Sequence, residues 1–236
     1  MFKLSRFHPV DARGAHSLEH RQAAWALTSA LLDYPTAGLL EHLDDVRAAV
    51  AALPAPYSQP LGRLVDHLAA GELRDLQEEY VATFDHTRRC ALYLTYFAYG
   101  DTRRRGVALV QFKQAYRRAG VDFADDELPD HVCAVLQFGA TVDADAAWRL
   151  LIDHRAGLEM LRLALAGWER SDGRGIGSPW LGAVVAVCDT LPVLQGDEAD
   201  AVRRLVEQGP PAEEVGLEPY GTDPVIATSI PVGAPQ

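Results

Sequence analysis

Apolar residues recur at intervals of three and four along almost the whole chain, and strict alternation of apolar and polar residues is nearly absent. Intervals of three and four place side chains on one face of a helix, whereas alternation is typical of a strand. Prolines, glycines and capping residues divide the pattern into segments. The pattern therefore predicts an all-α protein, a single globular bundle of about nine or ten helices with short connections.

Each predicted helix combines an apolar stripe with a proline, a glycine or a capping residue at an end. The helices cover residues 21–33, 36–53, 58–71, 72–84, 90–99, 102–119, 128–140, 143–165, 178–188 and 197–207. Thr36 and Asp101 are expected to cap the starts of two of them, and a third is expected to begin at Asp143. Ser58, with Pro60 in the first turn, is expected to open another. Gly71, Gly100 and Gly120 are expected to end theirs.

The two ends of the chain differ in composition from its middle. Residues 1–20 are expected to form a flexible lead-in, and residues 21–207 the helical domain. The prolines of residues 208–236 forbid regular structure and predict a disordered tail. The first residues lack the apolar region of a signal peptide, and no apolar stretch approaches the roughly 20 residues of a membrane span. We expect a cytoplasmic protein.

The charge balance narrows the classes of partner. The chain has 22 basic and 33 acidic residues, for a formal net charge of -11. Such a surface repels nucleic acids and anionic lipids and attracts basic partners. Cys90, Cys133 and Cys188 lie far apart and form no Cys-x-x-Cys, so we expect reduced, buried thiols and neither a disulfide nor a metal site. No cofactor is expected.

The segment Glu127-Leu128-Pro129-Asp130-His131 could carry chemistry. Acid and imidazole groups this close suit an acid–base or metal site, but adjacent helical residues point apart and no His-x-x-x-His pattern accompanies them. Proline and carboxylates also suit the first turn of a helix. Helix capping, ligand binding and catalysis therefore all remain open here, with capping favoured.

Aromatic residues gather in the middle of the chain. Tyr80 and Phe84 are four residues apart and share a helical face, and Tyr93 is expected to share one with Tyr96 and Phe97. Most of these side chains suit a core. The tyrosine hydroxyls need polar partners, however, and a half-exposed aromatic groove would bind an amphipathic peptide helix.

The arginine run 103–105 suggests phosphate binding at first sight. On an acidic protein, solvation and ion pairs with Asp85, Asp101 and Asp122 suit it better. The glycine-rich segment 171–177 lacks the Gly-Lys-Ser/Thr ending of a phosphate loop, and no serine or cysteine lies in a nucleophile motif. The residues therefore favour a binding module over an enzyme.

Three short segments resemble one known family. They are Glu-Glu-Tyr-Val-Ala-Thr-Phe-Asp at 78–85, Tyr-Gly-Asp-Thr-Arg at 99–103 and Glu-Leu-Pro-Asp-His at 127–131. In this order they resemble the nitrate reductase molybdenum cofactor assembly chaperones, the NarJ or delta-subunit family. That family belongs to the TorD/DmsD-like chaperones for the maturation of redox enzymes. The resemblance covers roughly residues 21–207.

The resemblance implies an all-helical chaperone that is not an enzyme. Such a chaperone binds the N-terminal segment of the reductase catalytic subunit and holds that subunit ready for insertion of the molybdenum cofactor. It would meet a membrane only indirectly, through the reductase. A chaperone for a dimethyl-sulfoxide or trimethylamine-oxide reductase is the alternative, followed by a small-ligand enzyme that uses Asp130 and His131.

The resemblance also implies which residues bind the peptide. These are Tyr80, Phe84, Asp85, Tyr93, Asp101, Arg103, Glu127, Pro129, Asp130 and His131. For Tyr93, Asp101 and Arg103 the family pattern leaves open whether the side chain contacts the peptide or holds the fold.

Overall fold

The computed structural model describes residues 17–100, 102–123, 127–168 and 177–194, together with residues 196, 200 and 204. Over these ranges the chain forms α-helices, one short 3-10 helix and a single isolated β-bridge, with no longer strand. This confirms the all-α prediction. The predicted lead-in 1–20 and helix 197–207 lie mostly outside the described residues, and the tail 208–236 lies wholly outside them.

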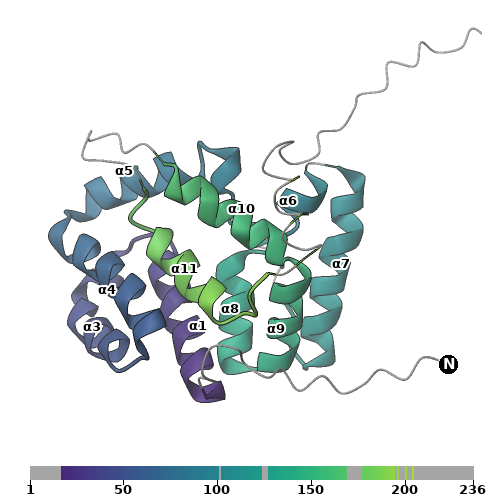
Figure 1. Cartoon of the computed structure of the whole chain (residues 1–236), viewed down its shortest axis with the longest axis horizontal. Coiled ribbons are helices and arrows are strands. Elements are labelled where there is room, and N and C mark those ends of the chain that lie inside the picture. The colour runs from purple at the N-terminus through teal and green to yellow at the C-terminus, as the bar shows by residue number, and fades with distance from the viewer. Residues whose placement is uncertain are drawn as a thin grey trace, which may run out of the picture.

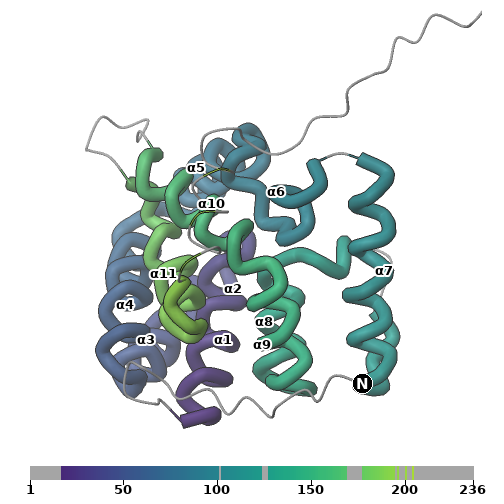
Figure 2. The backbone as a smooth tube through the Cα atoms, turned by 45° about the vertical axis from the view of Figure 1, so that its right-hand side comes forward, coloured from purple at the N-terminus to yellow at the C-terminus, as the bar shows by residue number. Residues whose placement is uncertain are grey.

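The helices form one bundle with α3 and α4 at one side and α7 along the opposite edge (Figures 1 and 2). In chain order the elements are α1 (Leu18–Leu32), α2 (Ala37–Glu41), α3 (Leu43–Ala51), α4 (Ala55–Ala70), α5 (Leu73–Phe84), η1 (Arg88–Cys90), α6 (Tyr96–Tyr99), α7 (Arg103–Arg118), α8 (Val132–Thr141), α9 (Ala144–Asp153), α10 (Arg155–Ala166) and α11 (Leu181–Asp189). Within the described parts of the chain, no helix is long and apolar enough to span a membrane.

Helix α1 lies inside the bundle and packs against α8 and α11. Trp25 is fully buried there, and its indole Nε1 donates a hydrogen bond to the hydroxyl of Thr190 at 3.0 Å. Gly139 lets α8 approach closely, because a Cβ at this position would lie 2.7 Å from the Trp25 ring. Helix α1 therefore forms part of the core and packs closely on α8.

Two predicted helices are each broken at a histidine. The predicted helix 36–53 ends at His42 and resumes as α3, and the predicted helix 143–165 is broken at His154. In both, imidazole Nδ1 lies 2.9 Å from the carbonyl oxygen four residues earlier. The side chain thus competes with the backbone for a helical acceptor, which the apolar pattern does not reveal.

Most predicted helix ends are confirmed. The Thr36 hydroxyl accepts from Leu39 N at 3.2 Å, and Asp143 accepts from Ala146 N at 2.8 Å. Gly71 is the C-cap of α4, while Gly100 and Gly120 end α6 and α7 with positive φ angles of 56° and 79°.

The prediction that Ser58 opens a helix is wrong, because α4 already begins at Ala55, after Pro54. The three cysteines are free and buried, as predicted. The proposed cap Asp101 lies outside the described residues.

Candidate functional site

A pocket of about 360 Å³ lies where α5 ends, α7 begins and the intervening segment 88–96 passes His131. Four of its side chains are large aromatic rings and three carry charge. The lining residues are Tyr80, Phe84, Asp85, Arg88, Ala91, Leu92, Tyr93, Tyr96, Arg105 and His131. Five of these belong to the ten residues predicted to bind a peptide.

The pocket depends on a short pairing of two distant segments. Tyr93 and His131 form an isolated antiparallel bridge, in which Val132 N donates to Leu92 O at 2.8 Å and Leu94 N to Asp130 O at 3.1 Å. This pairing replaces the ends of two predicted helices. The predicted helix 90–99 is only η1 and α6 joined by an extended stretch, and the predicted helix 128–140 begins only at residue 132.

The bridge changes which aromatic side chains lie together. The expectation that Tyr93 shares a helical face with Tyr96 and Phe97 is wrong, because Tyr93 lies in the extended stretch before α6. Its ring instead contacts the imidazole of His131 edge to face, with centroids 5.3 Å apart. Tyr96 and Phe97 are buried, as a core position requires.

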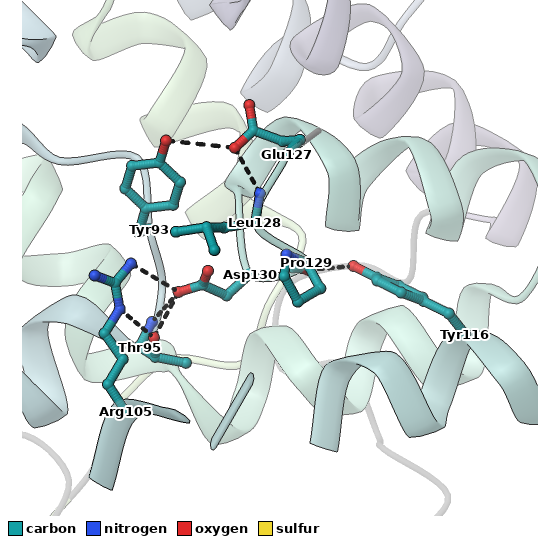
Figure 3. Close-up of polar contacts among 8 residues, drawn as sticks. All are labelled: Tyr93, Thr95, Arg105, Tyr116, Glu127, Leu128, Pro129 and Asp130. Carbon is teal, nitrogen blue, oxygen red and sulfur yellow. Dashed lines mark hydrogen bonds and ion pairs between the residues drawn. The ribbon is translucent and has the colours of Figure 1, made fainter. Parts of the chain in front are cut away.

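Asp130 is fully buried, and its carboxylate faces Thr95 and Arg105 (Figure 3). Its Oδ2 accepts hydrogen bonds from the Thr95 backbone N–H at 3.0 Å and from the Thr95 hydroxyl at 2.6 Å. The favoured interpretation as a helix cap is wrong, since the carboxylate binds the other segment of the bridge and no side chain caps the start of α8. The carboxylate therefore holds residues 92–95 against residues 128–131.

Arg105 lines the pocket but was not among the ten residues predicted to bind a peptide. Its Nε donates to the Thr95 hydroxyl at 3.2 Å, and its Nη2 lies 3.8 Å from Asp130 Oδ2. The guanidinium also lies 5.3 Å from the ring centroid of Tyr93 and 5.9 Å from that of Tyr96. It therefore joins the buried carboxylate to the aromatic wall.

A signal for Arg105 was present in the spacing of α7. The buried residues of this helix are Ala108, Phe112 and Tyr116. Arg105 precedes Ala108 by three residues and so belongs to the same face, whereas the exposed Arg103 does not. The interpretation of the whole run as a solvated surface is therefore wrong for its last member.

Contacts of Pro129 and Glu127 hold residues 128–131, the segment of the bridge that contains His131 (Figure 3). The Pro129 carbonyl accepts from the Tyr116 hydroxyl at 2.6 Å, which ties the segment to α7. Glu127 Oε1 accepts from Leu128 N at 2.8 Å and from the Tyr93 hydroxyl at 3.4 Å. Glu127 is exposed and Pro129 is buried, so only Glu127 could meet a partner.

Tyr80 and Phe84 form the inner wall of the pocket, and each is only 6% exposed. Their centroids lie 4.7 Å apart, and both rings contact buried Trp180. The Tyr80 hydroxyl donates to Leu32 O at 3.2 Å. Burial raises the pKa of Tyr80, with further contributions from nearby acidic groups that include Asp33. The shared face predicted for Tyr80 and Phe84 is confirmed.

The remaining predicted residues lie at different places. Asp85 is exposed at the edge of the pocket, and Arg103 is exposed on α7 and does not line it. Asp101 lies outside the described residues.

Carboxylates surround the imidazole of His131. Burial lowers the pKa of His131 below its ordinary value, and the carboxylates of Glu127 and Asp33 oppose that shift. Asp33 and Asp85 likewise act on Tyr80. Asp33, Asp85 and Glu127 are exposed. We call these three residues the acidic rim. Asp33 is a second residue that was not among the ten predicted to bind a peptide.

This arrangement suits binding better than acid–base chemistry. Within the described ranges, no group of three or more His, Cys, Asp and Glu side chains could hold a metal ion. The Asp130 carboxylate contacts Thr95 and Arg105, while the imidazole of His131 packs on Tyr93. The site therefore offers an aromatic recess for an apolar side chain, beside carboxylates for a basic one.

Comparison with known proteins places the chain in a family. The model of the nitrate reductase delta subunit family matches residues 50–167. The chain is 36% identical over 166 residues to the nitrate reductase-like protein NarX of Mycobacterium tuberculosis, which covers 70% of this chain but 24% of NarX. It is 31% identical over 128 residues to NarJ of Bacillus subtilis, which covers 54% of this chain and 70% of that protein.

A further relative supports the same placement, and a solved structure shares the fold. The nitrate reductase molybdenum cofactor assembly chaperone NarJ of Escherichia coli (strain K12) is 32% identical over 124 residues, 51% of this chain and 52% of that protein. A redox enzyme maturation protein from Archaeoglobus fulgidus shares the fold, with a TM-score of 0.51 at 20% identity over 75% of this chain and 94% of that one. The chain spans about a quarter of NarX and about half of Escherichia coli NarJ. The chain is similar in sequence to the NarJ assembly chaperones. It therefore belongs to the nitrate reductase delta subunit family.

Proposed function

We propose that this protein is a dedicated assembly chaperone of a nitrate reductase and not an enzyme. It binds the N-terminal segment of the catalytic subunit and holds that subunit competent for insertion of the molybdenum cofactor. It works in the cytoplasm and meets the membrane only through the reductase. The observation that carries the proposal is an aromatic pocket bordered by exposed carboxylates on a chain with net charge -11, in a member of this family.

The pocket's size and lining suit a peptide side chain. Its volume of about 360 Å³ is near the lower end of ligand pockets, which span roughly 300–1,000 Å³. An apolar side chain of an amphipathic helix would enter between Phe84 and Tyr93. Basic side chains on the same helix would meet the acidic rim, where opposite charge favours the correct register.

The predicted residues then divide into two groups with different tasks. Tyr80, Phe84, Asp85, Tyr93 and His131 line the pocket and would contact the peptide, with Glu127 at the acidic rim. Pro129 and Asp130 are buried and hold the bridge, together with Thr95 and Arg105. The geometry gives Arg103 no place at the pocket.

Calorimetric titration with a synthetic peptide of the catalytic subunit's N-terminal segment tests the proposal. Tyr93→Ala should weaken binding about tenfold or more, as expected for a tyrosine at the centre of an interface. Tyr99→Ala is the matched control, because Tyr99 is also partly exposed and nearby but does not line the pocket. A scrambled peptide should not bind. Equal loss in both variants, or no binding by the wild type at any salt concentration, would reject the proposal.

The same titration separates the alternative client enzymes. Peptides from the N-terminal segments of dimethyl-sulfoxide and trimethylamine-oxide reductases should bind more weakly than the nitrate reductase peptide. Tighter binding of either one would keep the chaperone activity but change its client.

A further inference from the structure

Helix α7 presents a basic face on an acidic protein. The helix holds six basic residues and no acidic one, although the whole chain has a net charge of -11. Arg103 and Arg104 are exposed at its start, and Arg117 and Arg118 are exposed at its end. Both views place α7 along one edge of the molecule, away from α3 and α4 (Figures 1 and 2). We call the exposed side of this helix the basic face.

Two valines lie between the arginine pairs. Val107 is 69% exposed and Val110 is 49% exposed. The helical period puts both on the side of Arg103 and Arg117, opposite the buried Phe112. The basic face thus reads basic, apolar, basic along the helix. Val107 and Val110 are exposed, so packing in the core does not explain why these positions are apolar.

The chain itself contains a segment with the complementary pattern. Residues 205–236 carry five acidic residues and no basic one, and they include Glu213-Glu214-Val215-Gly216-Leu217-Glu218. That stretch reads acidic, apolar, acidic. We infer that residues 213–218 dock on the basic face of α7, with Glu213 and Glu218 near opposite arginine pairs and the apolar side chains on Val107 and Val110.

The two patterns match in length. Arg103 and Arg117 are 14 residues apart, which is about 21 Å along a helix at 1.5 Å per residue. Glu213 and Glu218 are five residues apart, which is about 17 Å in an extended segment at roughly 3.3 Å per residue. The remaining difference is within the reach of flexible arginine side chains.

Because residues 213–218 are attached to the same chain as α7, weak contacts are sufficient for them to dock. Glu213 follows Arg204, the last described residue, by nine positions, and these nine residues can extend to about 30 Å, which exceeds the roughly 24 Å length of α7. A short flexible tether gives an effective concentration on the order of millimolar. The docked segment would cover the basic face against other anions, and added salt would release it because exposed ion pairs are screened.

Paramagnetic relaxation in the full-length chain tests this docking. A spin label on Gly221→Cys can be attached selectively, since the native thiols are buried and burial raises the pKa of Cys90 to about 11 and that of Cys188 to about 12. At low salt the label should remove the amide signals of α7. In about 0.5 M salt those signals should return, because the Debye length then falls well below 10 Å.

A charge variant and its control identify the contact. Changing Arg103, Arg104, Arg117 and Arg118 to Gln should restore the α7 signals at low salt. The pair Arg63→Gln and Arg149→Gln neutralises exposed arginines on α4 and α9 and should leave the broadening in place. Broadening spread evenly over the protein, or unchanged by the α7 substitutions, would overturn the proposal.

Anionic lipid is the competing occupant of the basic face. Phosphatidylglycerol vesicles, with phosphatidylcholine vesicles as control, are added to the wild-type chain and to the variant with the four α7 arginines changed. Vesicle binding that requires those arginines, together with no localised broadening by the label at low salt, would make the face a lipid site and reject the tail as its occupant.

Discussion

The buried carboxylate of Asp130 holds the two segments on which the pocket is built. It accepts two hydrogen bonds from Thr95, and Arg105 lies close to the same oxygen. Asp130→Asn removes the charge but keeps the shape, so the free energy of unfolding should fall by about 1.5–3 kcal/mol, the typical contribution of hydrogen bonds to a charged group. Urea unfolding measures this loss.

An exposed aspartate provides the control for this prediction. Asp122→Asn should change the free energy of unfolding by no more than about 0.5 kcal/mol because Asp122 is exposed. A double-mutant cycle of Asp130→Asn with Thr95→Val should show non-additive losses, because both changes disturb the hydrogen bond between the Thr95 hydroxyl and the carboxylate. Additive losses would mean that the carboxylate acts through another contact.

His131 should make the protein's stability depend on pH. Burial lowers its pKa in the folded state, whereas the unfolded chain has the ordinary value of about 6.5. Between these two values the unfolded state binds more protons, so stability is lost as the pH falls below about 6.5 and levels off below the folded pKa. His131→Gln should remove this contribution.

The measurement is the difference in unfolding free energy between wild type and His131→Gln, taken from pH 8 to pH 5. The pKa of His154 is also lowered by burial, but this residue is present in both proteins and its effect cancels in the difference. The wild type should lose more stability than the variant on acidification. A difference that stays constant over this range would show that His131 titrates normally in the folded state.

Among the elements, the crossing of α4 and α11 leaves no space for an added methyl group. A Cβ at Gly182 would overlap the carbonyl oxygen of Pro60, which is backbone and cannot move aside by rotation. Gly182→Ala should therefore lower the free energy of unfolding by about 1–3 kcal/mol or more, as overpacking does. Thermal and urea unfolding would both report it.

Gly62 on α4 is the matched control for this prediction. A Cβ there would meet nothing within 4 Å. Because alanine favours a helix over glycine by roughly 0.5–1 kcal/mol, Gly62→Ala should stabilise the protein. If both substitutions destabilise equally, the close approach of α4 and α11 at Gly182 would not be the cause of the loss.

The elements also show how far sequence patterns predict this fold. Periodicity and caps such as Thr36 and Asp143 identify helices because these signals act over a few residues. The pairing of residues 92–95 with 128–131 depends on contacts between residues about 35 positions apart, and no local signal announces it. Tyr80 and Phe84 could therefore be paired from spacing alone, whereas the position of Tyr93 could not.

Across the whole molecule, charge is distributed unevenly in a way that would direct a basic peptide. The net charge of -11 attracts any basic partner from a distance. The acidic rim, with Asp33 and Asp85, adds a local field beside the aromatic pocket. The net charge of the protein should raise the rate of all encounters with the peptide. The charge of the acidic rim should raise only the rate of encounters that lead into the pocket. Association kinetics can separate the two contributions.

Two variants with equal loss of charge make that separation. Asp33→Asn with Asp85→Asn should slow association of the reductase peptide several-fold at low salt, with little effect on dissociation, as expected for charges at an interface edge. Asp44→Asn with Asp45→Asn removes the same charge from exposed positions on α3, which does not line the pocket, and should slow association much less. In about 1 M salt, where the Debye length is about 3 Å, the two rates should converge. Equal slowing by both pairs at low salt would mean that net charge alone attracts the peptide, and the acidic rim would then have no part in guiding it to the pocket.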